Sequence, residues 1–234
     1  NLTSEGYATY IKEFKGGHNL NAVAGYSYFE NNGESFNMSN YNFAVDGVKF
    51  WDIGAGSYLS DGKAAMSSGK NITERLFSLF ARANYSYQDK YMLSASIRHE
   101  GSSKFAADNR WANFWSATAG WRISNEEFMK DFTWLDDLKV RFGYGVTGNN
   151  AIGSSKYTTN YSQTTYPMGN NENNSAYVVG TTLGNKDLKW ETLHATNIGL
   201  DISLFNSRVN LTAEWYNNQI SDLLMNCVIP SSTG

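Results

Sequence analysis

The feature that most constrains this chain is a strict alternation of apolar and polar side chains over long stretches. Between Arg75 and Tyr87, every second residue from Phe77 onward is apolar: Phe77, Leu79, Ala81, Ala83, Tyr85 and Tyr87. The same period of two resumes from Tyr91 to Glu100 and from Leu138 to Thr147. Side chains of a β-strand point alternately to opposite faces, so each stretch predicts a strand with one apolar and one polar face. Strands in soluble domains are usually about 5–6 residues long, so this greater length needs a reason.

Charged and aromatic positions indicate which solvent each face meets. Four arginines fall on the polar face of the predicted strands: Arg82, Arg98, Arg122 and Arg141. Tyrosine and tryptophan gather near strand ends on the apolar face, at Tyr85, Tyr87, Tyr91, Trp111, Trp115, Trp121, Trp190 and Trp215. A membrane barrel turns an apolar face with aromatic girdles to lipid and a polar face to a wet interior. We therefore expect an all-β, antiparallel transmembrane barrel wall.

Composition agrees with strands as the spanning elements. The longest apolar runs fall well short of the 18 or so residues that a membrane helix needs. Only Pro167 and Pro230 interrupt the chain, which suits long ladders. Cys227 is the single cysteine, so no disulfide framework is expected. The charge pattern lacks a basic stripe, which argues against a nucleic-acid partner.

The alternation predicts about eight strands, near 7–14, 20–28, 75–87, 91–100, 111–123, 138–147, 190–205 and 208–220. A capping pattern at Ser124 and Glu127 predicts a short amphipathic helix before Leu135. Two long polar segments, about 30–73 and 149–187, show no sustained period. Both follow even-numbered strands, whereas most other connections are short. Short turns at one end and long loops at the other are typical of an outer-membrane barrel.

Several motifs in order resemble the SusC/RagA-like family of TonB-linked outer-membrane proteins. They are YSYQDKY at 85–91, SIRHEGSSKF at 96–105, AGWRIS at 119–124, WLDDLK at 134–139, YGVTGN at 144–149, LKWET at 188–192 and NIGLD at 197–201. The resemblance is dense from about Asn71 to Leu224 and looser before it.

The resemblance implies a barrel of about 22 strands in a Gram-negative, Bacteroidetes-type outer membrane. It also implies a plug domain powered through TonB, a SusD-like surface lipoprotein as a lid, and import of oligosaccharides or peptides. This sequence contains neither the plug nor a final strand. We therefore expect residues 1–234 to be part of the barrel domain of a longer protein.

The sequence contains no catalytic constellation, cofactor motif or metal-ligand spacing, so we do not expect an enzyme. The best candidates for substrate contact are the tyrosines of the second long loop, because aromatic rings stack on sugars: Tyr157, Tyr161, Tyr166 and Tyr177. We expect Arg82, Arg98, Arg122 and Arg141 to face the lumen and contact the plug by charge-assisted hydrogen bonds.

Two other architectures fit part of the pattern. A soluble all-β carbohydrate-binding module would bury the apolar face in a two-layer core, sealing Leu79, Ile97, Phe142 and Leu200. A complete eight-stranded barrel would match the strand number, but its loops are unusually long for so small a rim. We prefer the wall segment of a large importer to both.

Overall fold

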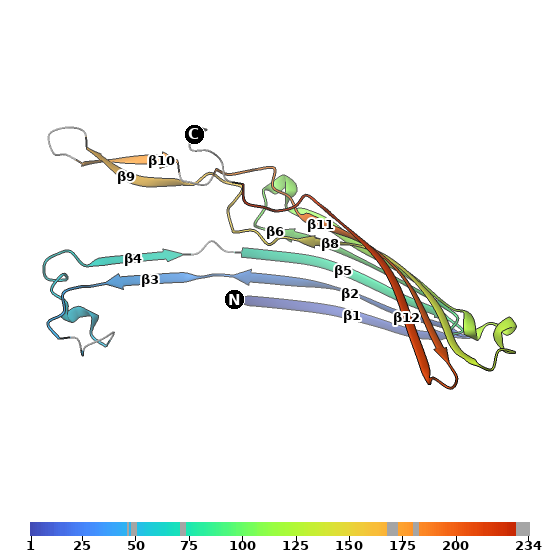
Figure 1. The fold of residues 1–234 in the computed structure, drawn as a ribbon. Coiled ribbons are helices and arrows are strands. Elements are labelled where there is room, and N and C mark those ends of the chain that lie inside the picture. The colour runs from blue at the N-terminus through green and yellow to red at the C-terminus, as the bar shows by residue number, and fades with distance from the viewer. Residues whose placement is uncertain (46, 48–50, 71–73, 168–172, 180–182, 228–234) are drawn as a thin grey trace.

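A computed structural model of the chain describes residues 1–45, 47, 51–70, 74–167, 173–179 and 183–227. Eight strands form one antiparallel sheet in the order β1-β2-β5-β6-β7-β8-β11-β12 (Figure 1). Their bounds are β1 (Leu2–Phe14), β2 (His18–Asn31), β5 (Glu74–Tyr87), β6 (Tyr91–Ser102), β7 (Trp111–Arg122), β8 (Leu135–Asn149), β11 (Glu191–Leu204) and β12 (Val209–Ser221). All eight predicted strands are present, and most extend further than the alternation indicated.

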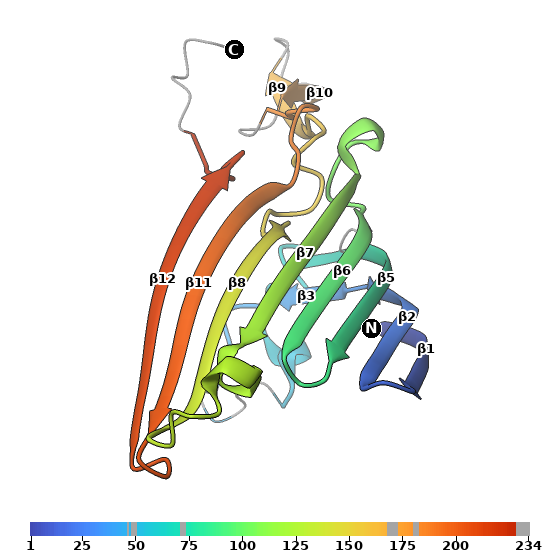
Figure 2. The same cartoon turned by 90° about the vertical axis from the view of Figure 1, so that its right-hand side faces the viewer.

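The sheet is an open, curved wall (Figure 2). Within the described residues, β1 pairs only with β2 and β12 only with β11. The alternative of a complete eight-stranded barrel is therefore wrong for this chain, because the two edge strands do not meet.

The register converts the alternation of each strand into two continuous faces. One row of paired residues crosses the sheet as Leu20, Tyr85, Leu93, Ala119, Phe142 and Ile198. The next row crosses it as Asn21, Asn84, Ser94, Thr118, Gly143 and Asn197. Because cross-strand partners share a face, the first row belongs to an apolar face and the second to a polar face.

The apolar face is not covered by a second layer of protein. Leu79, Ile97 and Phe142 are 49%, 52% and 49% exposed, and Leu200 is half-buried. The two-layer core of a soluble module is thus absent from the described residues. The polar face is concave, with a hollow of about 540 Å³ lined mainly by its side chains from β1 to β11.

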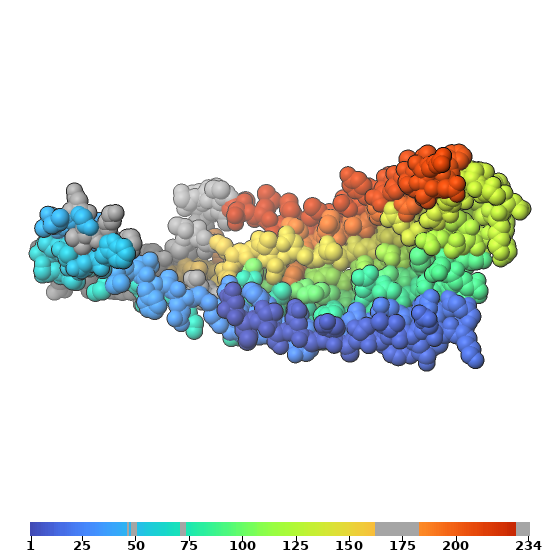
Figure 3. All heavy atoms as spheres, turned by 90° about the horizontal axis from the view of Figure 1, so that it is seen from below, coloured from blue at the N-terminus to red at the C-terminus, as the bar shows by residue number. Residues whose placement is uncertain are grey.

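Both long segments contain a hairpin that the sequence did not predict. The first holds β3 (Glu34–Ser39) and β4 (Ala65–Lys70), with the 3-10 turn η2 (Ile53–Ala55) near its tip; the second holds β9 (Tyr161–Pro167) and β10 (Asn173–Val179). Both hairpins project from the same end of the wall (Figure 1), and the β3/β4 hairpin reaches well past the sheet (Figure 3). We call them the β3/β4 arm and the β9/β10 arm, and their end of the wall the arm end.

The opposite end, here called the turn end, carries the short connections. The helix predicted there is wrong: two 3-10 turns, η4 (Ile123–Asn125) and η5 (Glu127–Met129), replace it. Ser124 does not cap a helix, because its hydroxyl donates to Asp137 at 2.9 Å. A further 3-10 turn, η3 (Ala107–Asn109), lies between β6 and β7 at the arm end. No helix within the described residues has the length and apolar character needed to cross a membrane.

A charge on the apolar face should destabilise the wall far more than the same charge on the polar face. We expect Ala95→Lys in the full-length protein, in a bilayer, to lower the free energy of unfolding by about 2–4 kcal/mol, because lysine would meet hydrocarbon. Ser96→Lys, on the other face, loses the 2.7 Å hydroxyl contact with Ser116 and should lower it by about 1 kcal/mol or less. Denaturant unfolding of the two variants checks this; equal losses would contradict the assignment of the faces.

Candidate functional site: the concave polar face and the arm-end seam

Three of the four predicted arginines are paired inside the sheet. Arg141 donates from Nε to Asp201 at 2.7 Å and from Nη2 to Glu214 at 2.8 Å, joining β8, β11 and β12. A Cβ atom at position 199 would lie 2.9 Å from the Arg141 guanidinium, so the glycine there leaves room for this side chain. Arg122 Nε lies 3.3 Å from the Asp137 carboxylate.

Arg98 and Arg82 show how differently two arginines on one face are used. Arg98 donates to Glu100 at 3.0 Å and to the hydroxyl of Ser78 at 2.7 Å, and Ser78 is 1% exposed. Arg82 is exposed and, within the described residues, its hydrogen bond goes to a neutral partner, Asn84 Oδ1, at 3.2 Å. All four guanidinium groups belong to the concave face, and their contact with a plug stays a prediction.

The wall has a seam between β7 and β8 at the arm end. The two strands pair only from Ser116 opposite Gly145 down to Arg122 opposite Lys139. Beyond Ser116, β7 continues to Trp111 and β8 to Asn149, and Figure 2 shows β7 leaning away from β8 there. Within the described residues, no ladder joins these last parts of the two strands.

An aromatic cluster fills this seam. Phe105, Phe114 and Trp190 are 0%, 7% and 5% exposed and are the buried hydrophobic residues of the described chain. The Trp190 ring lies 5.2 Å from the ring of Phe105 and 5.3 Å from that of Phe114. Trp190 was expected on the lipid-facing girdle, and that expectation is wrong. It precedes β11, so the alternation of that strand does not set its direction.

Side chains bridge the seam where backbone pairing is missing. Trp190 Nε1 donates to Arg110 O at 3.0 Å. Asn150 Nδ2 donates to Ser102 Oγ at 3.2 Å, and Lys104 Nζ donates to Asn150 O at 3.3 Å. The Lys104 ammonium also lies 2.8 Å from the carboxylate of Glu74. The β6–β7 connection, residues 103–110, thus holds β5, β8 and the segment before β11 together.

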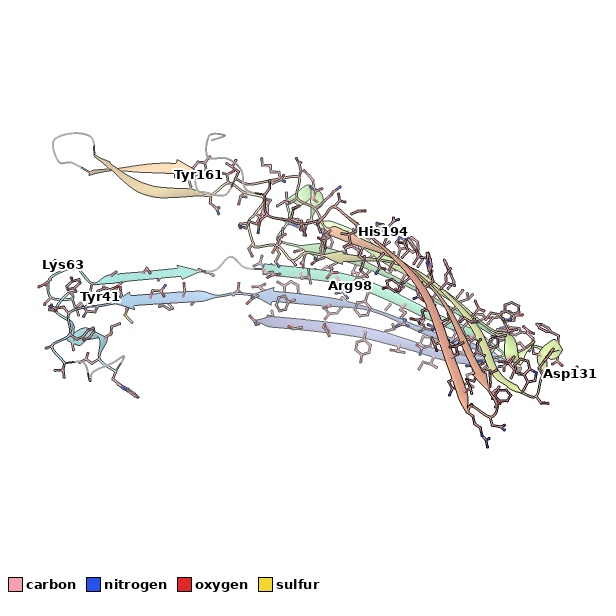
Figure 4. All side chains as sticks on the ribbon, viewed as in Figure 1. Tyr41, Lys63, Arg98, Asp131, Tyr161 and His194 are labelled. Carbon is pink, nitrogen blue, oxygen red and sulfur yellow. The ribbon has the colours of Figure 1, made fainter. Side chains whose placement is uncertain are left out.

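The four candidate tyrosines do not form one cluster in the described residues. Tyr157 is half-buried below the β9/β10 arm, and Tyr161 is 67% exposed at the start of β9 (Figure 4). The register places Tyr166 opposite Asn174 and Tyr177 opposite Gln163. The side chains of Tyr166 and Tyr177 lie outside the described residues, so their role stays a prediction.

At the turn end, aromatic side chains of the apolar face form a stacked row. The rings of Tyr87 and Tyr91 are 6.3 Å apart, and those of Tyr91 and Trp121 are 6.4 Å apart and nearly parallel. The Glu126 carboxylate accepts hydrogen bonds from Tyr91 at 2.7 Å, Lys90 at 3.0 Å and Trp121 at 3.1 Å. These bonds, led by that of Tyr91, lower the pKa of Glu126 below its ordinary 4.5. The expected aromatic girdle therefore carries a polar anchor, which periodicity alone could not reveal.

No group of three or more His, Cys, Asp or Glu side chains suited to a metal ion occurs among the residues that the structure describes. The concave face instead offers paired charges, amides and hydroxyls at the surface of a hollow. Such a face can bind a polar surface or a hydrated solute by hydrogen bonds. An apolar, uncovered outer face and a polar, concave inner face together define a segment of an outer-membrane β-barrel wall.

Comparison with known proteins identifies the family. The family model described as TonB dependent receptor-like, beta-barrel, matches residues 2–234, and the chain belongs to this family. It is 35% identical over 234 residues to TonB-dependent receptor P3 of Formosa agariphila, covering 100% of this chain and 23% of that protein. It is 35% identical over 178 residues to TonB-dependent receptor SusC of Bacteroides thetaiotaomicron, covering 74% of this chain and 17% of that one.

Solved structures give the same result. The structure of the RagAB peptide transporter superposes with a TM-score of 0.86 at 26% identity, covering 99% of this chain and 25% of that chain. The RagAB peptide importer in its open-open state gives a TM-score of 0.83 at 27% identity, with 99% and 24% covered. The predicted SusC/RagA-like family and barrel fold are confirmed. The chain spans about a quarter of the length of TonB-dependent receptor P3, 23%.

Gly148 should be intolerant of a side chain because of the seam. A Cβ there would lie 2.0 Å from the Phe114 ring, so Gly148→Ala must displace that ring. We expect a loss of about 1–3 kcal/mol in the free energy of unfolding of the full-length protein. Gly143→Ala is the matched control, since its Cβ would lie 3.5 Å from Thr118, an ordinary contact. Similar stability of the two variants in denaturant unfolding would contradict tight packing at the seam.

Glu126 should make stability depend on pH at the acid end. Its pKa is lowered on folding, so its stabilisation is complete above the ordinary value of 4.5 and is lost as the pH falls through the folded pKa. Glu126→Gln should therefore lower the melting temperature at pH 7, and the gap to wild type should narrow on acidification. Thermal melts across a pH series measure this. Glu127→Gln is the control, because its carboxylate is 78% exposed and pairs with Lys130, so its loss should matter less. A gap that widens in acid would refute the assignment.

Proposed function

We propose that this chain is part of the barrel wall of a TonB-dependent importer in the outer membrane. The observation that carries the proposal is the pair of faces: an uncovered apolar band outside and a concave polar surface inside. A soluble protein would lose stability by exposing so continuous an apolar surface. The family membership and the named receptors among the relatives support the same function.

The proposed orientation follows from the two ends of the wall. In outer-membrane barrels, short turns face the periplasm and long loops face the outside. The β3/β4 and β9/β10 arms would then extend from the cell surface. Figure 4 places Tyr41 and Lys63 at the tip of the β3/β4 arm and Asp131 at the opposite end of the molecule.

The arms are the parts of the chain best placed to meet a surface partner. Relatives include SusC, and the matched solved structures are of RagAB, titled a peptide transporter or importer. We propose that a SusD-like lipoprotein covers this barrel and that the solute is an oligosaccharide or a peptide. Exposed Phe36, Met38 and Met66 share one side of the β3/β4 register and would suit a protein contact.

Energy would reach the barrel through a plug that contacts the concave face. Among the four arginines, Arg82 is the best candidate for that contact, because Arg98, Arg122 and Arg141 already face carboxylates of this chain. An exposed guanidinium with only a neutral partner can donate further hydrogen bonds. TonB would act on the plug, and this wall would stay passive.

Uptake in cells tests the proposal. Deletion of the full-length gene should abolish growth on one solute class, oligosaccharides or peptides, and inactivation of TonB should have the same effect. We expect complementation with Tyr161→Ala to give about threefold to tenfold weaker uptake, from the loss of one aromatic contact. Tyr10→Ala, 51% exposed on the apolar face, is the control and should restore uptake fully. Undiminished growth on both classes after deletion, or uptake that persists without TonB, would refute the function.

A further inference from the structure

The seam between β7 and β8 lies directly under the β9/β10 arm. Two chain segments connect the arm to the wall: one leaves β8 after Asn149, and the other returns to β11 at Glu191. We call these two segments the stem. Both segments are held by the end of β6 and the β6–β7 connection. Asn150 bonds to Ser102 and Lys104, and the Lys186 carbonyl accepts a hydrogen bond from Asn109 Nδ2 at 3.3 Å. The base of the arm is therefore tied to β6 and β7 across the seam.

A second set of hydrogen bonds joins the two segments of the stem to each other above the seam. Asn185 N donates to Lys156 O at 3.0 Å, and Gly184 N donates to Thr159 Oγ1 at 3.1 Å. The approach is close enough that a Cβ on Gly184 would lie 2.2 Å from the backbone of Thr158. The arm thus stands on a narrow stem with its own bonds, and the stem stands on the seam.

Trp190 connects these layers. Its ring packs on Phe105 from the β6–β7 connection and on Phe114 from β7, while its backbone leads into β11. Its indole N–H satisfies the carbonyl of Arg110 at the end of the β6–β7 connection. Ile152 and Leu188 are half-buried, come from the two different segments of the stem, and pack against the same cluster. The aromatic cluster around Trp190 thus contacts the β6–β7 connection, the wall and the foot of the stem.

We propose that Trp190 is a positioning residue: it latches the β7–β8 seam and thereby sets the direction of the β9/β10 arm. With the latch in place, the arm moves with the wall as one body. Without it, no backbone ladder within the described residues holds β7 against β8 at this end, and the stem keeps only its polar ties to Ser102, Lys104 and Asn109. The inference concerns arm position, and its relevance to solute capture rests on the proposed function. Its test therefore uses no solute.

Hydrogen exchange in the full-length protein in a bilayer tests the latch. Trp190→Ala should speed exchange at the amides of Gly184, Asn185 and Leu188 by about tenfold or more, because their bonds would open locally. Trp190→Phe keeps a ring but loses the indole N–H, and it should give a smaller increase. Trp215→Ala, a 55% exposed tryptophan on the apolar face of β12, is the matched control and should leave these amides unchanged. Unchanged exchange in Trp190→Ala would overturn the proposal.

A distance measurement separates positioning from general support of the wall. Spin labels at Tyr161→Cys and Leu211→Cys, in a cysteine-free background, report the arm relative to the wall, and labels at Tyr10→Cys and Leu211→Cys report the wall alone. Trp190→Ala should broaden the first distance distribution and leave the second unchanged. Broadening of both, or of neither, would overturn the assignment.

A milder variant keeps the proposal testable if Trp190→Ala fails to fold. Asn109→Ala removes one exposed hydrogen bond between the β6–β7 connection and the Lys186 carbonyl, and it leaves the aromatic cluster intact. It should speed exchange at Leu188 by about twofold to fivefold, since one hydrogen bond contributes about 0.5–1 kcal/mol. An unchanged exchange rate at Leu188 would show that the β6–β7 connection does not hold the stem, and this would overturn the proposal.

Discussion

Backbone hydrogen bonding is the constraint on which the rest of this structure depends. In hydrocarbon, an unpaired amide or carbonyl costs several kcal/mol, so a spanning strand must be paired along its whole length. The eight wall strands are long and antiparallel, and none contains proline: Pro167 ends β9, and Pro230 lies outside the described residues. The seam between β7 and β8 is the departure from full pairing within the wall. It lies at the arm end, where water and side chains can satisfy the backbone, and there the buried aromatic cluster is found.

The two faces of the wall follow opposite rules for charge. On the apolar face, the charged side chains of the described residues lie toward the ends, as with Glu126 at the tips of Tyr91 and Trp121. On the concave face, cations and carboxylates are interleaved, so that Arg141 meets two acids from neighbouring strands. Ion pairs within the wall hold three of the four arginines, and Arg82 is the one without a carboxylate partner among the described residues.

The arms and the wall are stabilised by different interactions. The six inner wall strands, β2 to β11 in the sheet order, are paired with neighbours on both sides, and their apolar face suits a membrane. The β3/β4 arm is a two-stranded ribbon, which is marginal by itself, and it carries exposed apolar residues. The β9/β10 arm is a ribbon of the same kind, but its stem is tied to the seam by hydrogen bonds and by Trp190. The β3/β4 arm continues instead from the β2–β5 ladder, which is paired up to Asn31 opposite Glu74.

The sequence by itself determined the wall. Alternation at period two is a local property, so it predicted all eight strands and the faces of the later seven, while the facing of 7–14 stayed ambiguous. The ordered motifs indicated the family. The register places the four arginines on the polar face, and their contact with a plug stays a prediction. The hairpins inside 30–73 and 149–187 escaped detection, because a ribbon without one buried face leaves no clear alternation. The region after β7 carried a helix pattern, yet Ser124 and Glu126 bond to the wall and to its aromatic row instead.

Only the tertiary structure decided what happens at the seam. Trp190 precedes its strand, so no period fixes its direction, and its partners Phe105 and Phe114 are more than seventy residues away along the chain. Which arginines are already paired is likewise a matter of register between strands distant in sequence. Local patterns specify which face a side chain takes; contacts between distant segments decide whether that side chain is satisfied, buried or left available.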